Sequence, residues 1–341
     1  MNNNVAVVLL NWNGKNFLQK FLPSVIENSD NASIYVADNG SEDGSVDFLK
    51  QNFPSINIIC FEKNYGFAKG YNMALQQIEA EYFVLLNSDV EVTPNWISPI
   101  ITFLDSKEDY VACQPKILSY YDRSYFEYSG GAGGFIDRYG YPFCRGRLFD
   151  TLEKDNGQYD EDCEIFWATG ACLFVRAQVF HEFGGFDEDF FAHMEEIDLC
   201  WRFKNAGYKI GYCHSSVIYH VGGGSLPKSS PYKTYLNIRN NEVMLIKNLY
   251  KPSFHIIIFR FILDFVAAFK FWKDNSFKDF KSVIKAHFYV INNIFSIKHK
   301  QKNIEPKKVS CIYKKLLIWQ YYTKKKKTFD QLNKKDFIAK S

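Results

Sequence analysis

The sequence predicts an α/β protein with a Rossmann-like sheet flanked by helices. Short apolar runs without a polar break suit strands that are buried on both faces, and a turn rich in Asn, Asp and Gly follows each run. Helix-like segments separate the runs, so the chain shows three strand–turn–helix repeats and a fourth strand before residue 90. Repeats of this kind build a parallel sheet with right-handed crossovers.

Polar residues follow each of the four predicted strands, which cover residues 5–10, 33–37, 56–61 and 82–86. The carboxyl ends of parallel strands meet at one edge of a sheet, and open α/β sheets bind their ligands at this edge. We therefore expect the four polar clusters to share one site. The clusters are Asn13; Asp38 and Asn39; Asn64 and Gly66; and Asn87, Ser88 and Asp89.

Any one of these clusters is ordinary turn chemistry, and only their recurrence at four successive strand ends favours a binding site. A dinucleotide-binding Rossmann protein is the obvious alternative. However, the first turn reads NWNG without a GxGxxG pattern, and the glycine-rich run at 129–134 has the wrong spacing and does not open a helix. A pyrophosphate cradle of that kind is therefore not predicted. After the fourth strand, Thr93 and Pro94 predict the start of the next helix.

The charge is divided unevenly along the chain. Residues 1–250 carry 20 Lys and Arg against 32 Asp and Glu, whereas residues 251–341 carry 21 against 6. The sequence thus predicts an acidic body followed by a basic tail. The eight cysteines are dispersed without a CxxC pair, and no basic region precedes the short apolar run at the N-terminus. We expect a cytoplasmic protein.

The tail begins with a long aromatic stretch at 254–272. Four charged or ionisable residues interrupt it, which argues against a membrane-spanning helix and for an amphipathic helix in the lipid headgroup region. Packing on the protein body or in a dimer is the alternative. Beyond it, lysines alternate with aromatic and aliphatic residues up to Lys327, a composition that anionic lipids attract. We expect residues 254–327 to bind the inner face of the cell membrane, and no nucleic-acid partner, because no recognition motif accompanies the lysines.

A second block of acidic residues, at 195–198, opens a predicted helix that is largely buried and ends near Gly207. Acids in a first turn complement the helix dipole, and Asp198 stands four residues before Arg202, the spacing of an ordinary ion pair. Asp198 is therefore expected to have a structural role. Glu195 and Glu196 have no such partner nearby in the sequence, and both are candidates for a general base.

Downstream, His220 ends a predicted strand and precedes three glycines. A lone His after a strand is usually structural, but glycines allow the backbone to close on a ligand or to move as a lid. A helix is predicted to follow at 232–250, and it carries Arg239.

In their order and spacing, the segments VVLLNWNG, VADNGSEDGS, NYGFAKGYN and FVLLNSDV resemble the nucleotide-sugar half of family 2 glycosyltransferases of the GT-A fold, with the rhamnosyltransferase-like branch the most similar. The resemblance extends to about residue 250. It implies a mixed sheet flanked by helices, a nucleotide-sugar half at 1–105, an acceptor and catalytic half at 106–250, and a C-terminal amphipathic helical extension at 251–341.

The resemblance also implies ligands for a nucleotide diphosphate sugar and a divalent cation, either Mg²⁺ or Mn²⁺. Asp89 and His220 would hold the cation, although the family's Asp-x-Asp motif has Asn87 at its first position here. Mg²⁺ tolerates this change because it takes few carboxylates and keeps phosphate oxygens and waters. The residues implied in nucleotide-sugar binding are Asn13, Asp38, Asn39, Asn64, Gly66, Lys69, Asn87, Ser88 and Arg239.

The acidic block resembles the family's Glu-Asp-x-Asp-Leu-x-x-Arg motif, whose second acid is the catalytic base. By position this acid is Glu196, with Glu195 and Asp198 in support. Thr169 and Gly170 lie where the family has its acceptor site. The implied function is an inverting transfer of a sugar from a UDP- or dTDP-sugar to a hydroxyl of a glycan acceptor, lipid-linked, in surface polysaccharide synthesis. A sugar nucleotidyltransferase and a non-catalytic membrane-bound scaffold are the alternatives.

Overall fold

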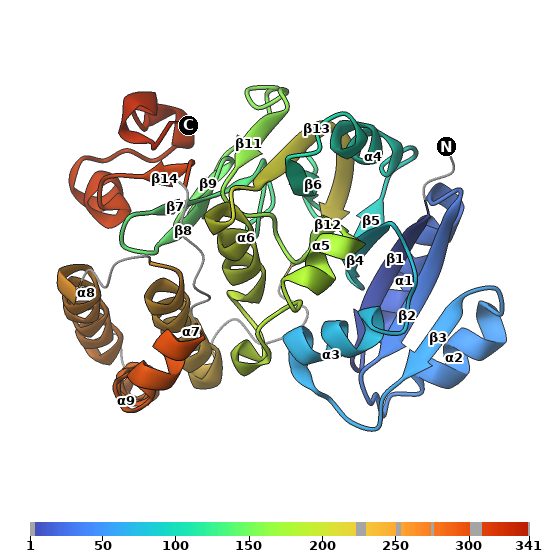
Figure 1. Cartoon of the computed structure of the whole chain (residues 1–341), viewed down its shortest axis with the longest axis horizontal. Coiled ribbons are helices and arrows are strands. Elements are labelled where there is room, and N and C mark those ends of the chain that lie inside the picture. Colours follow the sequence, from blue (N-terminus) through green and yellow to red (C-terminus); the bar gives the residue numbers. More distant parts are fainter. Residues whose placement is uncertain (1–3, 223–229, 250–253, 274–275, 301–308, 340–341) are drawn as a thin grey trace.

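The computed structural model describes residues 4–222, 230–249, 254–273, 276–300 and 309–339 (Figure 1). Within them, a nine-stranded mixed sheet has the order β11–β13–β6–β12–β4–β1–β2–β3, and β5 pairs with β13. The strands are β1 (Val5–Asn11), β2 (Ala32–Asp38), β3 (Asn57–Cys60), β4 (Tyr82–Asn87), β5 (Val90–Val92), β6 (Tyr110–Ser119), β11 (Cys163–Ile165), β12 (Cys172–Arg176) and β13 (Lys209–His220).

The four strands predicted from the apolar runs form the parallel half of this sheet. Their register aligns the strand ends, since Asn11 pairs with Asp38 and Leu10 with Asn87. The other half is mixed, because β12 runs antiparallel to both β4 and β6. The polar clusters after the strands therefore do lie along one edge, as the sequence predicts.

Alternating side chains of β1 show how both faces of the sheet are covered. Val5, Val7 and Leu9 lie in one buried cluster, while Ala6 and Val8 lie in another. The first cluster is covered by α1 (Lys15–Asn28), α2 (Ser45–Asn52) and α4 (Ser98–Asp105). The second is covered by α3 (Gly66–Leu75), α5 (Ala177–Glu182), α6 (Glu195–Asn205) and α7 (Pro231–Asn248).

The helix predicted to begin at Thr93 and Pro94 begins later, at Ser98, and this prediction was wrong. The short strand β5 intervenes, and the Thr93 hydroxyl donates a hydrogen bond to the carbonyl of Val217 instead of capping a helix. Pro99 takes the place in the first turn of α4 that Pro94 was expected to take.

A second, smaller sheet lies beside the first and includes the C-terminal end of the described chain. Its order is β10–β9–β8–β7–β14, and β14 pairs in parallel with β7. Residues 309–339 thus form a strand and short helical turns packed on the body, with Leu317 and Tyr321 buried. The strands are β7 (Gly134–Asp137), β8 (Pro142–Cys144), β9 (Arg147–Leu148), β10 (Thr151–Leu152) and β14 (Ile312–Tyr313).

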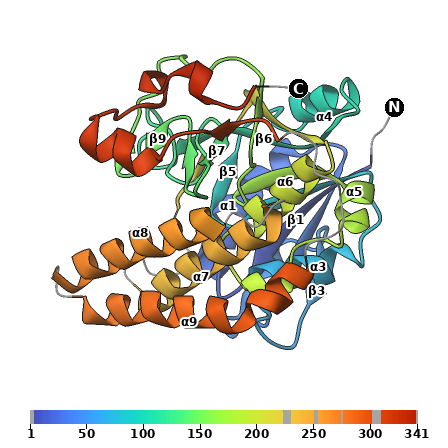
Figure 2. The ribbon, with the colours of Figure 1, turned by 60° about the vertical axis from the view of Figure 1, so that its left-hand side comes forward.

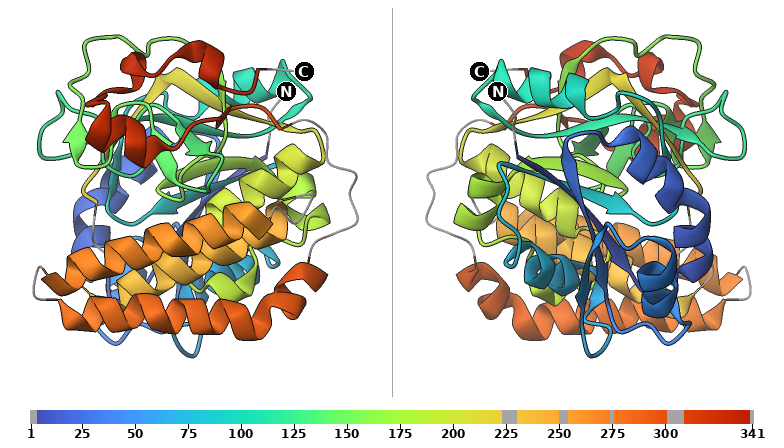
Figure 3. Two further views of the ribbon diagram at one scale, coloured as in Figure 1. Left: turned by 90° about the vertical axis from the view of Figure 1, so that its left-hand side faces the viewer. Right: turned by 90° about the vertical axis from the view of Figure 1, so that its right-hand side faces the viewer.

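The helical part of the C-terminal extension consists of α8 (Phe254–Lys273) and α9 (Phe277–His299). Figure 2 shows them as two long rods beside α7, and Figure 3 shows the three helices stacked at one side of the molecule. Thr234 of α7 donates a hydrogen bond to Asp279 of α9, which joins the pair to the body. Among the described residues, no helix is both long enough and apolar enough to cross a membrane.

Candidate active site

Strand pairing brings Asp89 and His220 together, although 131 positions separate them in the sequence. Asp89 lies in the turn between β4 and β5, and His220 ends β13 opposite Val90 of β5. The Nε2 atom of His220 lies 3.1 Å from Oδ1 of Asp89, and both side chains are buried. On the other side of the ring, Nδ1 lies 3.4 Å from Oε2 of Glu127.

The two carboxylates decide the charge of this histidine. Burial alone would lower the pKa of His220, but Glu127 and Asp89 outweigh it and raise the pKa to about 10. Burial would likewise raise the pKa of Asp89, yet His220 holds it below its usual value. Without a cation His220 is therefore protonated at neutral pH, and a cation bound at Nε2 would take the place of one of its two ring protons.

The spacing of Asp89 and His220 fits a divalent cation. Two neighbouring ligand atoms on an octahedral cation with bonds of about 2.1 Å lie about 3.0 Å apart. The observed separation between Oδ1 and Nε2 is 3.1 Å, which is also that of the hydrogen bond between them. An imidazole nitrogen and a carboxylate oxygen suit Mn²⁺, and they suit Mg²⁺ when phosphate oxygens and waters complete the shell. The donor set present therefore fits the implied cation.

Hydrogen bonds join the turns after β1 and β2, which carry the predicted nucleotide-binding residues Asn13 and Asp38. One carboxylate oxygen of Asp38 accepts a hydrogen bond from Asn11, and the other accepts one from the backbone N–H of Ser41. Asn13, at a positive φ of 51°, accepts from the N–H of Glu42. These bonds hold the first two turns in fixed shapes at the edge of the sheet.

The same holds for the turn after β3. Asn39 donates to the side chain of Asn64 and to the carbonyl of Gly66, and its own oxygen accepts from the N–H of Tyr65. Lys69, on α3, is exposed and forms a 3.4 Å ion pair with Glu188. The structure thus brings the first three polar clusters together.

The loop before α6 joins this edge to the acidic block. The carbonyl of Phe191 accepts hydrogen bonds from the N–H groups of Phe67 and Ala68 in the first turn of α3. Phe191, His193 and Met194 all have positive φ, at 61°, 71° and 75°, a conformation that costs about 1–3 kcal/mol for a residue other than glycine. Strain of this kind concentrates at functional sites.

Asn240 of α7 holds this strained loop. Its side-chain amide donates to the carbonyls of Phe190, Ala192 and His193. The neighbouring Arg239 donates to the carbonyls of Asp189 and Phe190 and lines a small hollow between α7, α9 and this loop. Arg239 also donates to Asn240 and packs on the rings of Tyr235 and Tyr289, and its predicted role at the diphosphate stays a prediction.

The two candidate bases stand at the start of α6. Burial raises the pKa of Glu196 to about 7, although nearby backbone N–H groups, one of them that of Gly170, favour its charged form. Glu195 is buried, and its pKa is raised well above the usual value by burial and by Glu196. Among the described residues, neither Oε2 atom has a hydrogen-bond partner. Each acid thus keeps one oxygen uncommitted.

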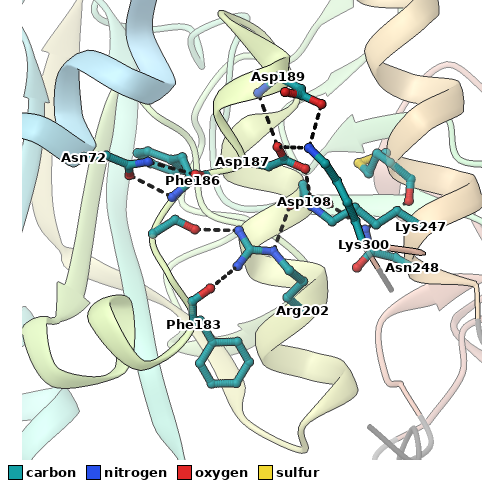
Figure 4. Close-up of polar contacts among 12 residues, drawn as sticks. Asn72, Phe183, Phe186, Asp187, Asp189, Asp198, Arg202, Lys247, Asn248 and Lys300 are labelled. Atoms are coloured by element: carbon teal, nitrogen blue, oxygen red, sulfur yellow. Dashed lines mark hydrogen bonds and ion pairs between the residues drawn. The ribbon is translucent and has the colours of Figure 1, made fainter. Parts of the chain in front are cut away.

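Both carboxylate oxygens of Asp198, by contrast, are hydrogen-bonded to neighbouring side chains (Figure 4). Its carboxylate accepts hydrogen bonds from Arg202, Lys247 and Asn248, at 2.9, 2.8 and 2.8 Å, and the predicted i,i+4 ion pair with Arg202 is present. Lys247 also binds Asp187. Asp198 therefore serves as a buried anchor that ties α6 to α7.

Contacts link the start of α6 with the end of β4. The backbone N–H of Gly170 lies beside the carboxylate of Glu196, and the carbonyl of the next residue, Ala171, accepts a hydrogen bond from the N–H of Asn87. Asn87 stands two residues before Asp89. Thr169 is buried, and a Cβ atom on Gly130 would lie 2.7 Å from its side chain. That Glu196 and the Asp89–His220 pair share one site stays a prediction.

Two contributors were not predicted from the sequence. Glu127 lies in an irregular segment after β6, and nothing in its sequence neighbourhood indicates a histidine partner 93 positions away. Asn240 adjoins the predicted Arg239, but its hydrogen bonds to the loop before α6 were not predicted. In both cases the role depends on tertiary contacts, and a single sequence carries no local signal for such contacts.

Comparison with known proteins identifies the relationship. Residues 6–182, just over half of the chain, match the model of glycosyl transferase family 2. N-acetylglucosaminyl-diphospho-decaprenol L-rhamnosyltransferase of Mycobacterium tuberculosis is 26% identical over 232 residues, which cover 63% of this chain and 75% of the relative. The dTDP-rhamnosyl transferase RfbF of Shigella flexneri is 22% identical over 263 residues, which cover 73% of this chain and 82% of the relative.

Solved structures show the same fold. GalNAc-T7, crystallised with UDP, GalNAc and Mn²⁺, matches with a TM-score of 0.59 at 15% identity; the match covers 86% of this chain and 58% of that one, less than two thirds of its length. Mannosyltransferase PcManGT of Pyrobaculum calidifontis, in complex with GDP-Man and Mn²⁺, matches with a TM-score of 0.50 at 12% identity, over 85% of this chain and 75% of that one. The predicted GT-A fold is confirmed.

Proposed function

The chain belongs to glycosyltransferase family 2, and we propose that it is an inverting, metal-dependent enzyme that transfers a sugar from a nucleotide diphosphate sugar to a hydroxyl group of a glycan acceptor. The observation that carries this proposal is the placement of Glu196. Its carboxylate has a raised pKa and, among the described residues, one oxygen without a hydrogen-bond partner. It lies beside Gly170, and the next residue, Ala171, bonds Asn87 two positions before Asp89.

The reaction follows from these positions. Glu196 takes the proton of the acceptor hydroxyl as that oxygen attacks the anomeric carbon, and the bond from this carbon to the diphosphate breaks on the opposite face. One displacement needs one base and inverts the anomeric centre. The strand-end turns bind the nucleotide and orient the sugar. A divalent cation held by Asp89 and His220 would supply positive charge to the departing diphosphate.

We propose Glu196 over Glu195 as the base. Both acids have an uncommitted oxygen, but Glu196 contacts Gly170, in the segment that the resemblance assigns to the acceptor site. Glu195 is more deeply buried, and the charge of its neighbour further opposes its ionisation. A general base must be ionised near the working pH, and a pKa of about 7 meets this condition.

For the donor we propose a dTDP-linked deoxyhexose, with a UDP-linked sugar as the second choice. The names of the relatives, an L-rhamnosyltransferase and a dTDP-rhamnosyl transferase, support this choice. The same mycobacterial name supports a lipid-linked diphosphate glycan as the acceptor class. A donor-hydrolysis screen with dTDP-, UDP- and GDP-sugars in the presence of Mn²⁺ tests the assignment. Turnover restricted to dTDP-sugars is expected, and consumption of a nucleoside triphosphate would instead support a nucleotidyltransferase.

We further propose that α8 and α9 rest on the inner face of the cell membrane. The exposed face of α8 is almost entirely apolar, and its residues recur at helical spacing, while exposed lysines lie at its end and along the first half of α9. The apolar residues of this α8 face are Ile258, Phe259, Ile262, Phe265, Val266, Phe269 and Trp272; the lysines are Lys270, Lys273, Lys278, Lys281 and Lys285.

This surface is narrower than the segment 254–327 expected from the sequence. Leu317 and Tyr321 lie within that segment, but they are buried against the small sheet and do not face lipid. Residues 301–308 lie outside the described residues. A second copy of the chain could cover the same apolar face, but the adjacent lysines favour an anionic lipid surface.

A further inference from the structure

We propose that Glu127 is a positioning residue for the cation site: its carboxylate accepts the Nδ1 proton of His220 and so presents the Nε2 lone pair to the cation beside Asp89. This inference rests on the proposed function, because it assumes the cation site at Asp89 and His220. Neither the sequence pattern nor the family resemblance assigns Glu127 a role at the site.

The geometry places His220 between two carboxylates with separate tasks. Nε2 faces Oδ1 of Asp89 at 3.1 Å, and Nδ1 faces Oε2 of Glu127 at 3.4 Å. A histidine that ligates a metal through one nitrogen commonly gives the proton on its other nitrogen to a carboxylate, which fixes both the tautomer and the ring orientation. Glu127 is the carboxylate that faces Nδ1, on the side of the ring away from Asp89.

The surrounding backbone holds Glu127 in this position. Glu127 donates its N–H to the carbonyl of Ile117 in β6, the strand next to β13, and its carboxylate accepts a hydrogen bond from the N–H of Ser129. Gly222, at a φ of 73°, closes the pocket from the other side, because a Cβ atom there would lie 2.7 Å from Oε1. The side chain is only 4% exposed.

A merely structural role explains this arrangement less well. A buried carboxylate is costly unless its partners repay the lost hydration. Apart from the N–H of Ser129, the contact that the structure gives the carboxylate is the one with His220. Among the described residues, His220 is thus the side chain with which the buried Glu127 carboxylate pairs.

The test is a titration of Mn²⁺ into the full chain in the presence of dTDP or UDP, with free Mn²⁺ followed by electron paramagnetic resonance. Glu127→Gln should weaken Mn²⁺ binding by about 10- to 100-fold. Glu153→Gln is the matched control, because Glu153 is a buried glutamate whose hydrogen bonds are with Tyr159 and the N–H of Phe329 and not with His220. It should leave Mn²⁺ affinity within about twofold of the wild type.

A second readout separates positioning from folding. Nitrogen NMR of histidine-labelled protein with Mg²⁺ and nucleotide should show His220 protonated at Nδ1 only, and Glu127→Gln should lose this single tautomer while the unfolding temperature of the apo protein stays close to that of Glu153→Gln. Unchanged Mn²⁺ affinity in Glu127→Gln, with a clear loss in Asp89→Asn, would overturn the inference alone. Unchanged affinity in Asp89→Asn would instead remove the proposed cation site.

Discussion

The backbone N–H of Gly170 lies beside the carboxylate of Glu196 and favours its charged form. The two residues belong to different parts of the fold, since Glu196 opens α6 and Gly170 precedes β12 in the central sheet. Because β12 is paired with β4, this contact links the proposed base to the strand that leads to Asp89. The catalytic proposal depends on that relationship.

The pH profile of transfer should report the state of Glu196. Burial raises its pKa to about 7, and the base must be deprotonated to act. We expect kcat/KM to rise with pH through about 7 and then to level off. The measurement is initial transfer rate against pH at low acceptor concentration. A rate already at its plateau at pH 5 would contradict a base with a raised pKa.

The same shift has an opposite consequence for stability. Burial raises the pKa of Glu196 from its usual 4.5 to about 7, so the stability it contributes is present below pH 4.5 and is lost as pH rises through about 7. Glu196→Gln copies the protonated form and should therefore raise the unfolding free energy at pH 8 by about 1–3 kcal/mol, but have little effect at pH 4. Thermal unfolding at the two pH values checks the sign.

The buried network around Asp198 should be structural. Lys247 bonds both Asp198 and Asp187 and is only 6% exposed, so Lys247→Met removes a buried cation from two carboxylates that keep Arg202 and Lys300 as their remaining cationic partners. We expect a loss of about 3–5 kcal/mol of unfolding free energy. The control is Lys209→Met, whose pair with Asp109 is exposed and should be worth less than about 1 kcal/mol. Equal losses in the two variants, measured by urea unfolding, would refute the network's structural role.

Membrane binding should depend on the α8–α9 surface. Replacement of Phe265, Phe269 and Trp272 by Ser should abolish cosedimentation with vesicles that contain anionic phospholipid, because these side chains would insert among the lipids. The matched control replaces Trp319 and Tyr322 by Ser. These two side chains are comparably exposed but lie in the C-terminal segment 309–339. If the control variant lost binding and the α8 variant kept it, the lipid-binding surface would be the wrong one.

The lysines of α9 should set the lipid preference. Changing Lys278, Lys281 and Lys285 to Gln should weaken binding to anionic vesicles by about 100-fold, at about 1 kcal/mol for each lysine, while any weak binding to neutral vesicles stays the same. A concentration-dependent dimer that survives these changes, seen by analytical ultracentrifugation, would assign the apolar face to a second copy instead.

Local patterns predict the parallel half of the fold because each strand there is a short apolar run with its own turn. The antiparallel strands were less predictable. The pairing of β12 with β4, and of β5 with β13, joins segments that are 80 or more positions apart, and no local pattern specifies such pairs. The resemblance to a known family supplied the mixed sheet instead.

The site divides in the same way. Asp89 is indicated by its place after a strand, and Glu195 or Glu196 by the start of a helix, while the family motif supplied the choice of Glu196. The proposed role of Glu127 depends on a histidine that only tertiary structure brings near. The predicted lipid-facing segment extended too far toward the C-terminus for another reason. Its lysines are exposed and suit a lipid surface, but Leu317 and Tyr321 between them point into the body and complete the small sheet's core.

The assignment of the base is the central claim, and one variant tests it most directly. Glu196→Gln should abolish sugar transfer, with a loss of at least about 100-fold in kcat, because general-base catalysis contributes this much or more. Its affinity for the nucleoside diphosphate with Mn²⁺, measured by isothermal titration, should equal that of the wild type. Transfer retained at more than about a tenth of the wild-type rate would contradict the account, whatever the nucleotide affinity.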